Sequence, residues 1–84
     1  MGVLKRSGFL VLKTIRLNES GYPDIIAMKE GRTCWIEIKE EDDTLKALQM
    51  KRINDLNAQG IGAICIQKNK GIIYGEKKGV PIPI

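Results

Sequence analysis

Hydrophobic positions along the chain fall into short runs that are separated by glycine-containing or charged segments. Runs that are rich in β-branched and aliphatic residues and bounded by turn residues are typical of β-strands. The pattern predicts five strands, at Phe9 to Leu17, Asp24 to Met28, Thr33 to Lys39, Ile61 to Gln67 and Ile72 to Tyr74. Turn residues Lys29 to Arg32 join the second and third strands, which predicts a β-hairpin in the middle of the chain.

The pattern changes after the third strand. Residues Asp43 to Ala58 contain neither glycine nor proline, and their apolar residues recur at helical spacing, at Leu45, Leu48, Ile53 and Leu56. This predicts one amphipathic helix. Its expected N-cap is Asp42, Asp43 or Thr44, and Gly60 is its expected C-terminal stop.

The predicted order is three strands, one helix and two strands, without repeats or linkers. The step from Thr33 through the helix to Gln67 should be a right-handed crossover between parallel strands. We therefore expect an α/β fold, a mixed β-sheet with one principal crossover helix, forming a single domain over residues 1 to 84. The tail from Val80 to Ile84 is extended by its prolines, as an arm that covers a partner or as a frayed terminus.

The composition restricts the chemistry that this chain can perform. Fourteen Lys and Arg against ten Asp and Glu give a net charge of +4, which favours an anionic partner such as nucleic acid but is weak by itself. The chain has no histidine, which excludes histidine bases and histidine-ligated metals. Cys34 and Cys65 lie in apolar runs without CxxC spacing and are interpreted as buried small hydrophobes. Any catalyst here must use carboxylates and lysine.

The sequence has no segment that suggests a membrane or an exported protein. No apolar run approaches the roughly 20 residues that cross a bilayer, and no signal-peptide core precedes the first strand. We expect a cytoplasmic protein without membrane contact.

Alternation along the third strand separates its side chains. Ile36 and Ile38 can enter the core, while Trp35, Glu37 and Lys39 point to the other face. Glu37 and Lys39 are then neighbours about 7 Å apart. Without further signals they would be an ordinary exposed pair.

Asp24 changes this interpretation. Pro23 restricts the residue before it to an extended conformation and Gly21 permits a turn, so Asp24 enters the second strand at a defined point. Hairpin pairing can place it beside Glu37. Two adjacent carboxylates require neutralisation, and an oxygen-only ligand set suits Mg²⁺ or Mn²⁺. Such a cation could activate water for attack on a phosphodiester, while Lys39 holds that water or stabilises phosphoryl charge.

One polar residue falls on the apolar stripe of the predicted helix. Gln49 lies between Leu45, Leu56 and Ile53 on a helical wheel. It either lies at the edge of the stripe, reaching solvent or backbone, or reaches the site water or Lys39.

These residues together resemble a known nuclease pattern. Gly21-Tyr22-Pro23-Asp24, Ile36-Glu37-Ile38-Lys39 and the downstream Gln49 match the PD-(D/E)xK pattern, and the sequence looks most like the VRR-Nuc family, over residues 8 to 67. The resemblance implies a restriction-endonuclease-like core. It also implies that Mg²⁺ or Mn²⁺ binds Asp24, Glu37 and the backbone carbonyl of Ile38. Stand-alone members are commonly viral, including phage proteins, and some dimers cut four-way (Holliday) junctions, so a viral member would act in the host cytoplasm.

The chain departs from this family at its start. Members usually begin with a full helix that bears an acidic residue near the metal, whereas only Met1 to Ser7 precede the first predicted strand. Glu19 could substitute for that acid.

The resulting hypothesis is a homodimeric, Mg²⁺- or Mn²⁺-dependent deoxyribonuclease that acts on structured DNA. The family resemblance implies that it leaves 5′-phosphate ends. The basic residues available for DNA contact are Lys13, Arg16, Lys46, Lys51 and Arg52, each of which could instead be a solvated surface charge. A two-fold dimer would give two active centres for a branched or duplex substrate. The alternatives are a non-catalytic DNA-binding or assembly module with the nuclease fold, or a plain structural domain.

Overall fold

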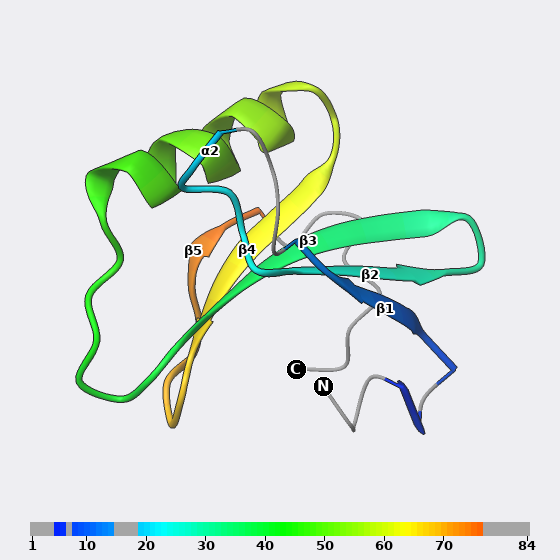
Figure 1. Ribbon diagram of the computed structural model, residues 1–84, viewed down its shortest axis with the longest axis horizontal. Coiled ribbons are helices and arrows are strands. Elements are labelled where there is room, and N and C mark those ends of the chain that lie inside the picture. Colours follow the sequence, from blue (N-terminus) through cyan, green and yellow to red (C-terminus); the bar gives the residue numbers. More distant parts are fainter. Residues whose placement is uncertain (1–4, 7, 15–18, 77–84) are drawn as a thin grey trace.

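A computed structural model describes residues 5–6, 8–14 and 19–76, and the statements below concern these residues. Five strands form one sheet in the order β1-β2-β3-β4-β5, and one helix, α2, packs on it (Figure 1). Their bounds are β1 Leu10–Lys13, β2 Ile25–Lys29, β3 Arg32–Lys39, α2 Ala47–Ala58, β4 Gly62–Gln67 and β5 Gly71–Gly75. No helix among the described residues is long and apolar enough to cross a membrane.

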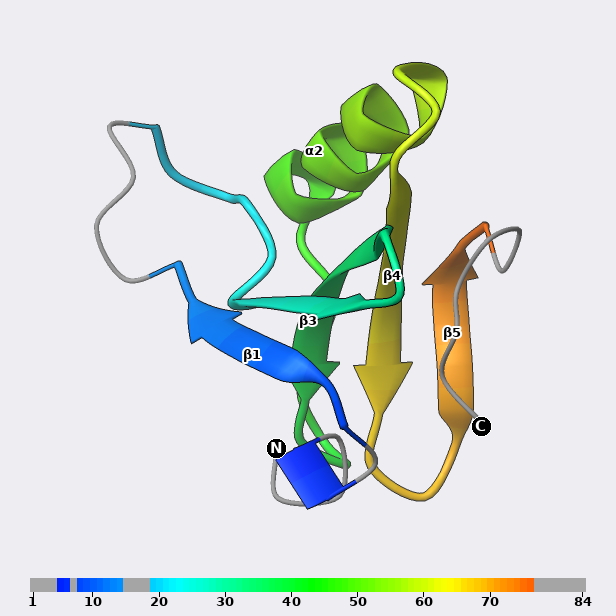
Figure 2. The same ribbon diagram turned by 90° about the vertical axis from the view of Figure 1, so that its right-hand side faces the viewer.

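The sheet is mixed, as the sequence predicts. Strand β3 pairs antiparallel with β2 and parallel with β4, and the two outer pairings are antiparallel. The hairpin between β2 and β3 turns at Glu30 and Gly31, both at positive φ. Figure 2 shows that the sheet is strongly twisted, so that β1 runs at a steep angle to β4 and β5. The predicted first strand is longer than β1, and its predicted end at Leu17 lies outside the described residues.

The helix begins later than predicted. Its N-cap is Lys46, and none of the three expected caps, Asp42, Asp43 and Thr44, occupies that position. The physical reason is a turn before the helix, in which Asp43 N donates to Glu40 O at 3.1 Å and Thr44 N to Asp43 Oδ1 at 2.9 Å. The C-terminal stop at Gly60 is confirmed, because its φ of 80° ends the helix and its N–H donates to Asn57 O.

Each face of the sheet carries an apolar cluster. On the α2 face, buried Ile53, Ala63 and Cys65 pack with four partly buried residues, Trp35, Leu45, Leu56 and Tyr74. The other face holds Phe9, Val11, Ile25, Ala27, Cys34, Ile36 and Ile64. Both cysteines are free and buried, as predicted, and burial raises the pKa of the Cys34 thiol to about 12.

One predicted core residue is exposed. Ile38 shares a face with Ile36, yet it is 45% exposed, so the prediction that it enters the core is wrong. The reason lies in the neighbouring strand. Because β2 begins at Ile25, opposite Ile36, the last residues of β3 have no β2 neighbour to pack beside them.

Gly21 lets the segment before β2 lie against the helix. Its φ is 87°, and a Cβ atom there would lie 2.6 Å from Leu48 Cγ. The light-blue segment in Figure 1 approaches α2 at this point. Arg52 of α2 fastens the same segment, since its Nε donates to Ser20 O at 3.1 Å.

We expect Gly21→Ala to lower the free energy of unfolding by about 2 to 4 kcal/mol, because it adds left-handed backbone strain to overpacking. Urea unfolding followed by fluorescence of the single tryptophan, Trp35, measures this change. Gly31→Ala is the matched control, since Gly31 has a φ of 77° and nothing within 4 Å of its added Cβ. Equal losses in the two variants would show that the contact with Leu48 is unimportant.

Candidate functional site

The hairpin register brings Asp24 opposite Glu37. Ile25 pairs with Ile36 in antiparallel β2 and β3, so the preceding residue, Asp24, is level with the following residue, Glu37. Residues directly opposite one another in an antiparallel pair project from the same face, with Cβ atoms about 4.5 to 5.5 Å apart. Both carboxylates therefore lie on the face that carries α2, with Asp24 exposed and Glu37 only 3% exposed.

Contacts with β1 and its end fix the position of Asp24. Thr14 N donates to Asp24 O at 2.9 Å, and Thr14 Oγ1 donates to Pro23 O at 2.5 Å. Pro23 is fully buried. On its other side, the Tyr22 ring lies 6.0 Å from the Trp35 ring and 4.9 Å from the Arg52 guanidinium. The acidic side chain thus projects from a backbone that is held from both sides.

Glu37 is a buried carboxylate with an unsatisfied oxygen. Burial is the main cause that raises the pKa of Glu37 to about 7, followed by the close side chain of Asp24, and Lys39 opposes the shift. Its Oε1 is buried without a hydrogen-bond partner among the described residues, and Oε2 lies 3.9 Å from Lys39 Nζ. Such an oxygen is costly unless a proton or a cation satisfies it.

The residues present fit a hard divalent cation. The unpartnered oxygen of Glu37 and the adjacent carboxylate of Asp24 are the ligand type that Mg²⁺ and Mn²⁺ prefer. Within the described ranges, no group of three His, Cys, Asp or Glu side chains is gathered as a ready-made metal cluster. Mg²⁺ commonly completes such a ligand set with backbone oxygen and water.

Lys39 lies on the same face as Glu37, two residues further along β3. It is 6% exposed, and its Nζ is 3.9 Å from Glu37 Oε2 and 3.7 Å from Asp43 Oδ2. Its backbone oxygen accepts a hydrogen bond from Lys68 N at 3.0 Å. The structure thus brings together the two carboxylates and the lysine that the sequence predicts to be neighbours.

Gln49 and Glu19 have other contacts in this structure. Gln49 Oε1 accepts a hydrogen bond from Lys46 N at 3.0 Å, which is the backbone-bonding alternative for this residue. A role of Gln49 at the site stays a prediction. Glu19 pairs with Arg52, at 3.5 Å from Oε2 to Nη2, so its carboxylate is held near α2.

The residues predicted to contact DNA are dispersed. Lys13 and Lys46 are exposed at the end of β1 and the start of α2, and Arg16 lies outside the described residues. Arg52 is less available, because its side chain is 18% exposed and engaged with Glu19 and Ser20. Lys51 is exposed and forms an ion pair with Asp55. DNA contact by this set stays a prediction.

Two residues that the sequence analysis did not assign to the site adjoin Lys39. The sequence predicts Asp43 as a possible helix cap and Gln67 as the end of an apolar strand. Gln67 is 7% exposed and is the register partner of Lys39 in the parallel β3–β4 pair. A polar residue that ends a strand otherwise made of apolar residues was the available signal for Gln67.

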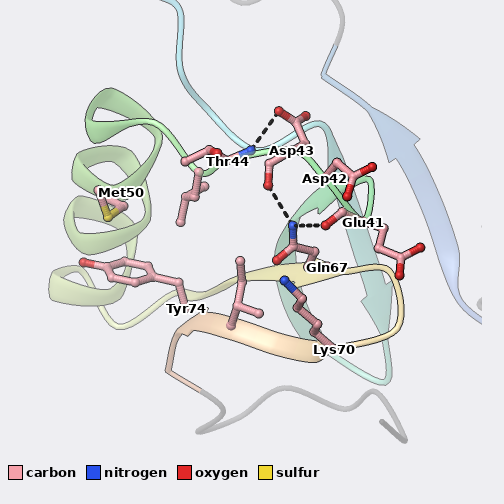
Figure 3. A pocket seen from close by; sticks show the side chains of 10 residues that line it. Glu41, Asp42, Asp43, Thr44, Met50, Gln67, Lys70 and Tyr74 are labelled. Carbon is pink, nitrogen blue, oxygen red and sulfur yellow. Dashed lines mark hydrogen bonds between the residues drawn. The ribbon is translucent and has the colours of Figure 1, made fainter.

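A pocket of about 540 Å³ lies beside these two residues (Figure 3). Figure 3 shows Gln67 facing the loop after β3, while Met50 of α2 and Tyr74 of β5 lie on the opposite side of the pocket. The residues that line it are Glu41, Asp42, Asp43, Thr44, Leu45, Met50, Gln67, Lys70, Ile73 and Tyr74.

Comparison with known structures identifies the fold. Among eleven solved chains that match is Hjc of Archaeoglobus fulgidus, a Holliday junction resolvase from an archaeal hyperthermophile. The TM-score is 0.62 at 22% sequence identity, over 80% of this chain and 60% of Hjc, so the chain spans less than two thirds of that protein's length. The protein has a restriction-endonuclease-like fold.

Sequence comparison adds no family assignment. No protein-family model matches the chain, and no curated protein matches it. The VRR-Nuc resemblance and the single domain over residues 1 to 84 therefore stay predictions.

Proposed function

We propose that this protein is a metal-dependent nuclease that hydrolyses DNA phosphodiester bonds. The observation that carries the proposal is the cross-strand pair of Asp24 and Glu37, with Lys39 adjacent. Among the residues that the structure describes, one buried Glu37 oxygen has no hydrogen-bond partner. Asp24, Glu37 and the backbone carbonyl of Ile38 would hold Mg²⁺ or Mn²⁺. The nuclease-type fold supports this assignment.

Each residue has a defined part in such a reaction. A bound Mg²⁺ or Mn²⁺ would supply Lewis-acid polarisation of a phosphoryl oxygen and a more acidic water. Asp24 and Glu37 provide oxygen donors and two negative charges. Lys39, which is only 6% exposed, donates hydrogen bonds to the attacking water or to a phosphoryl oxygen on which charge develops. Gln49 supports this group in the same hypothesis.

The proposed substrate is structured DNA such as a four-way junction, cut by a homodimer. The structural likeness to a Holliday junction resolvase supports this choice, together with the net charge of +4. Lys13, Arg16, Lys46 and Arg52 are the proposed DNA contacts. Two copies related by a two-fold axis would offer one active centre to each of two strands.

A cleavage panel tests this function. Junction, flap, duplex and single-stranded DNA are incubated with Mg²⁺, Mn²⁺ or chelator, and light scattering measures the subunit number. We expect junction cleavage with either metal and none with chelator. Cleavage that survives exhaustive chelation would contradict metal dependence, and an inactive protein on every substrate would contradict the proposal as a whole.

The alternative is a non-catalytic DNA-binding or assembly module that retains the fold. The observation that favours it is the lack of a three-residue ligand cluster among the described residues. Calorimetry with Mn²⁺ separates the two functions. A nuclease should bind Mn²⁺ in a manner that Asp24→Asn and Glu37→Gln abolish, whereas a module that binds DNA without metal should show no such heat.

A further inference from the structure

The loop between β3 and α2 folds back so that the Asp43 carboxylate lies close to Lys39. Asp43 Oδ1 accepts a hydrogen bond from Thr44 N at 2.9 Å, and Oδ2 lies 3.7 Å from Lys39 Nζ. The bond to Thr44 fixes the side-chain orientation, so that the second oxygen is directed at the lysine. Within 4.0 Å, the described residues give the ammonium two carboxylate neighbours, Glu37 and Asp43.

Gln67 ties this loop to the sheet. Its Nε2 donates to the backbone oxygen of Glu40 at 3.0 Å. The same nitrogen donates to the backbone oxygens of Glu41 at 3.1 Å and Asp43 at 2.7 Å (Figure 3). An amide nitrogen carries two hydrogens, so three acceptors share them and are drawn around one point. The amide is buried, and losing a buried donor leaves these backbone oxygens without that partner.

Gln67 and Asp43 both lie next to Lys39, Gln67 in the neighbouring strand β4 and Asp43 in the loop. Gln67 is level with Lys39 in the parallel pairing of β3 and β4, and Lys68 N donates to Lys39 O at 3.0 Å. The start of the loop and the end of β4 are therefore held together directly behind the lysine. Asp43, four residues after Lys39, closes the arrangement from the loop.

We propose that Asp43 and Gln67 are positioning residues for Lys39: Gln67 anchors the loop, and the loop presents the Asp43 carboxylate that holds the ammonium. The inference rests on the proposed function, in which Lys39 faces the scissile phosphate. Without Asp43, Glu37 is the remaining carboxylate beside the ammonium among the described residues. The ammonium then loses one of the two carboxylates that hold it, and it is no longer kept in its working position.

Asp43→Asn is the direct test, because asparagine keeps an oxygen for Thr44 N and removes the charge that faces Lys39. On junction DNA with saturating Mn²⁺ we expect kcat to fall roughly 10- to 100-fold, since small misplacements of catalytic groups have effects of this size. KM should change by less than about two-fold, because substrate binding is retained. Asp43→Glu, which restores the charge, should recover part of kcat.

Asp42→Asn is the matched control, since it removes the same charge from the neighbouring exposed position in the same turn. It should keep wild-type kcat and KM. Equal kcat in Asp43→Asn and wild type would overturn the proposal. So would an equal fall in the two variants, because the effect would then come from loop charge in general.

A double-mutant cycle tests whether Gln67 acts through Asp43. Gln67→Leu keeps the side-chain size at a buried position and removes the amide. If the amide works by presenting Asp43, Gln67→Leu should lower kcat in the wild-type background and have a smaller effect in Asp43→Asn. Fully additive effects on kcat would contradict this link.

A readout without DNA separates failure of this inference from failure of the proposed function. The two Hε protons of Lys39 should have distinct NMR shifts in the metal-free wild type, where the ammonium is held, and should merge in Asp43→Asn. Distinct shifts in both proteins would refute positioning by Asp43. If the shifts merge in Asp43→Asn but the wild type cuts no DNA, the result supports positioning by Asp43 and contradicts the nuclease function.

Discussion

Lys39→Ala should lower kcat on junction DNA by about 100- to 1,000-fold, the usual effect of removing one donor that stabilises transition-state charge. The lysine lies on the face of Asp24 and Glu37. The residue is only 6% exposed, and its Nζ has Glu37 and Asp43 as carboxylate neighbours. Its ammonium is thus fixed before substrate binds. Single-turnover cleavage of labelled junction with Mn²⁺ measures the loss without a contribution from product release.

Two further variants make this result specific. Lys39→Met removes the charge while keeping most of the side-chain volume, so it should be as inactive as the alanine variant and better packed. Lys70→Ala removes an exposed lysine that is not among the predicted DNA contacts, and it should cut at the wild-type rate. Lys39→Met with undiminished cleavage would take the lysine out of the mechanism.

The paired carboxylates could be predicted because their placement depends on local rules. Alternation along β3 puts Glu37 and Lys39 on one face, and a short hairpin turn sets the register that carries Asp24 to Glu37. Gly21 and Pro23 predict the entry into β2, and in the structure Gly21 has a positive φ and Pro23 is fully buried. The parallel step from β3 through α2 to β4 followed from the same strand and helix periods.

The residues around Lys39 could not be predicted because their contacts join distant segments. Gln67 reaches backbone oxygens 24 to 27 positions earlier in the chain. Aspartate is a common helix-cap residue, so the sequence favours that role for Asp43. Its ion pair with Lys39 depends on how the loop packs, which the local sequence does not show. The exposure of Ile38 likewise depends on where β2 begins, which is a property of the sheet and not of β3.

Metal should stabilise the protein through Glu37, and Glu37→Gln should abolish this effect. With Mn²⁺ at 100 times its Kd, a ligand that binds the folded state alone adds about 2.7 kcal/mol to the free energy of unfolding. We propose that the ion binds at the buried Glu37 oxygen, which has no hydrogen-bond partner in the described part of the chain. Urea unfolding at pH 7.5 with and without Mn²⁺ measures this change in the free energy of unfolding. Glu40→Gln is the control, because it replaces an exposed carboxylate next to β3, and it should be stabilised by Mn²⁺ as much as the wild type. A full shift in Glu37→Gln would place the ion elsewhere.

Without metal, the same carboxylate should make stability fall as pH rises. Burial and Asp24 raise the pKa of Glu37 from 4.5 to about 7 in the folded protein, so folding favours its protonated form. The stability that Glu37 contributes is fully present below pH 4.5 and is lost progressively as pH rises to about 7. Above that pH, the free energy of unfolding no longer changes with the ionisation of Glu37. Glutamine stays neutral throughout, so metal-free Glu37→Gln should become more stable than wild type across this window, by a few kcal/mol at pH 7.5. A stability difference between the two proteins that does not vary from pH 4.5 to 7 would mean that Glu37 is ionised without cost, and its buried oxygen would then give no reason to bind a cation.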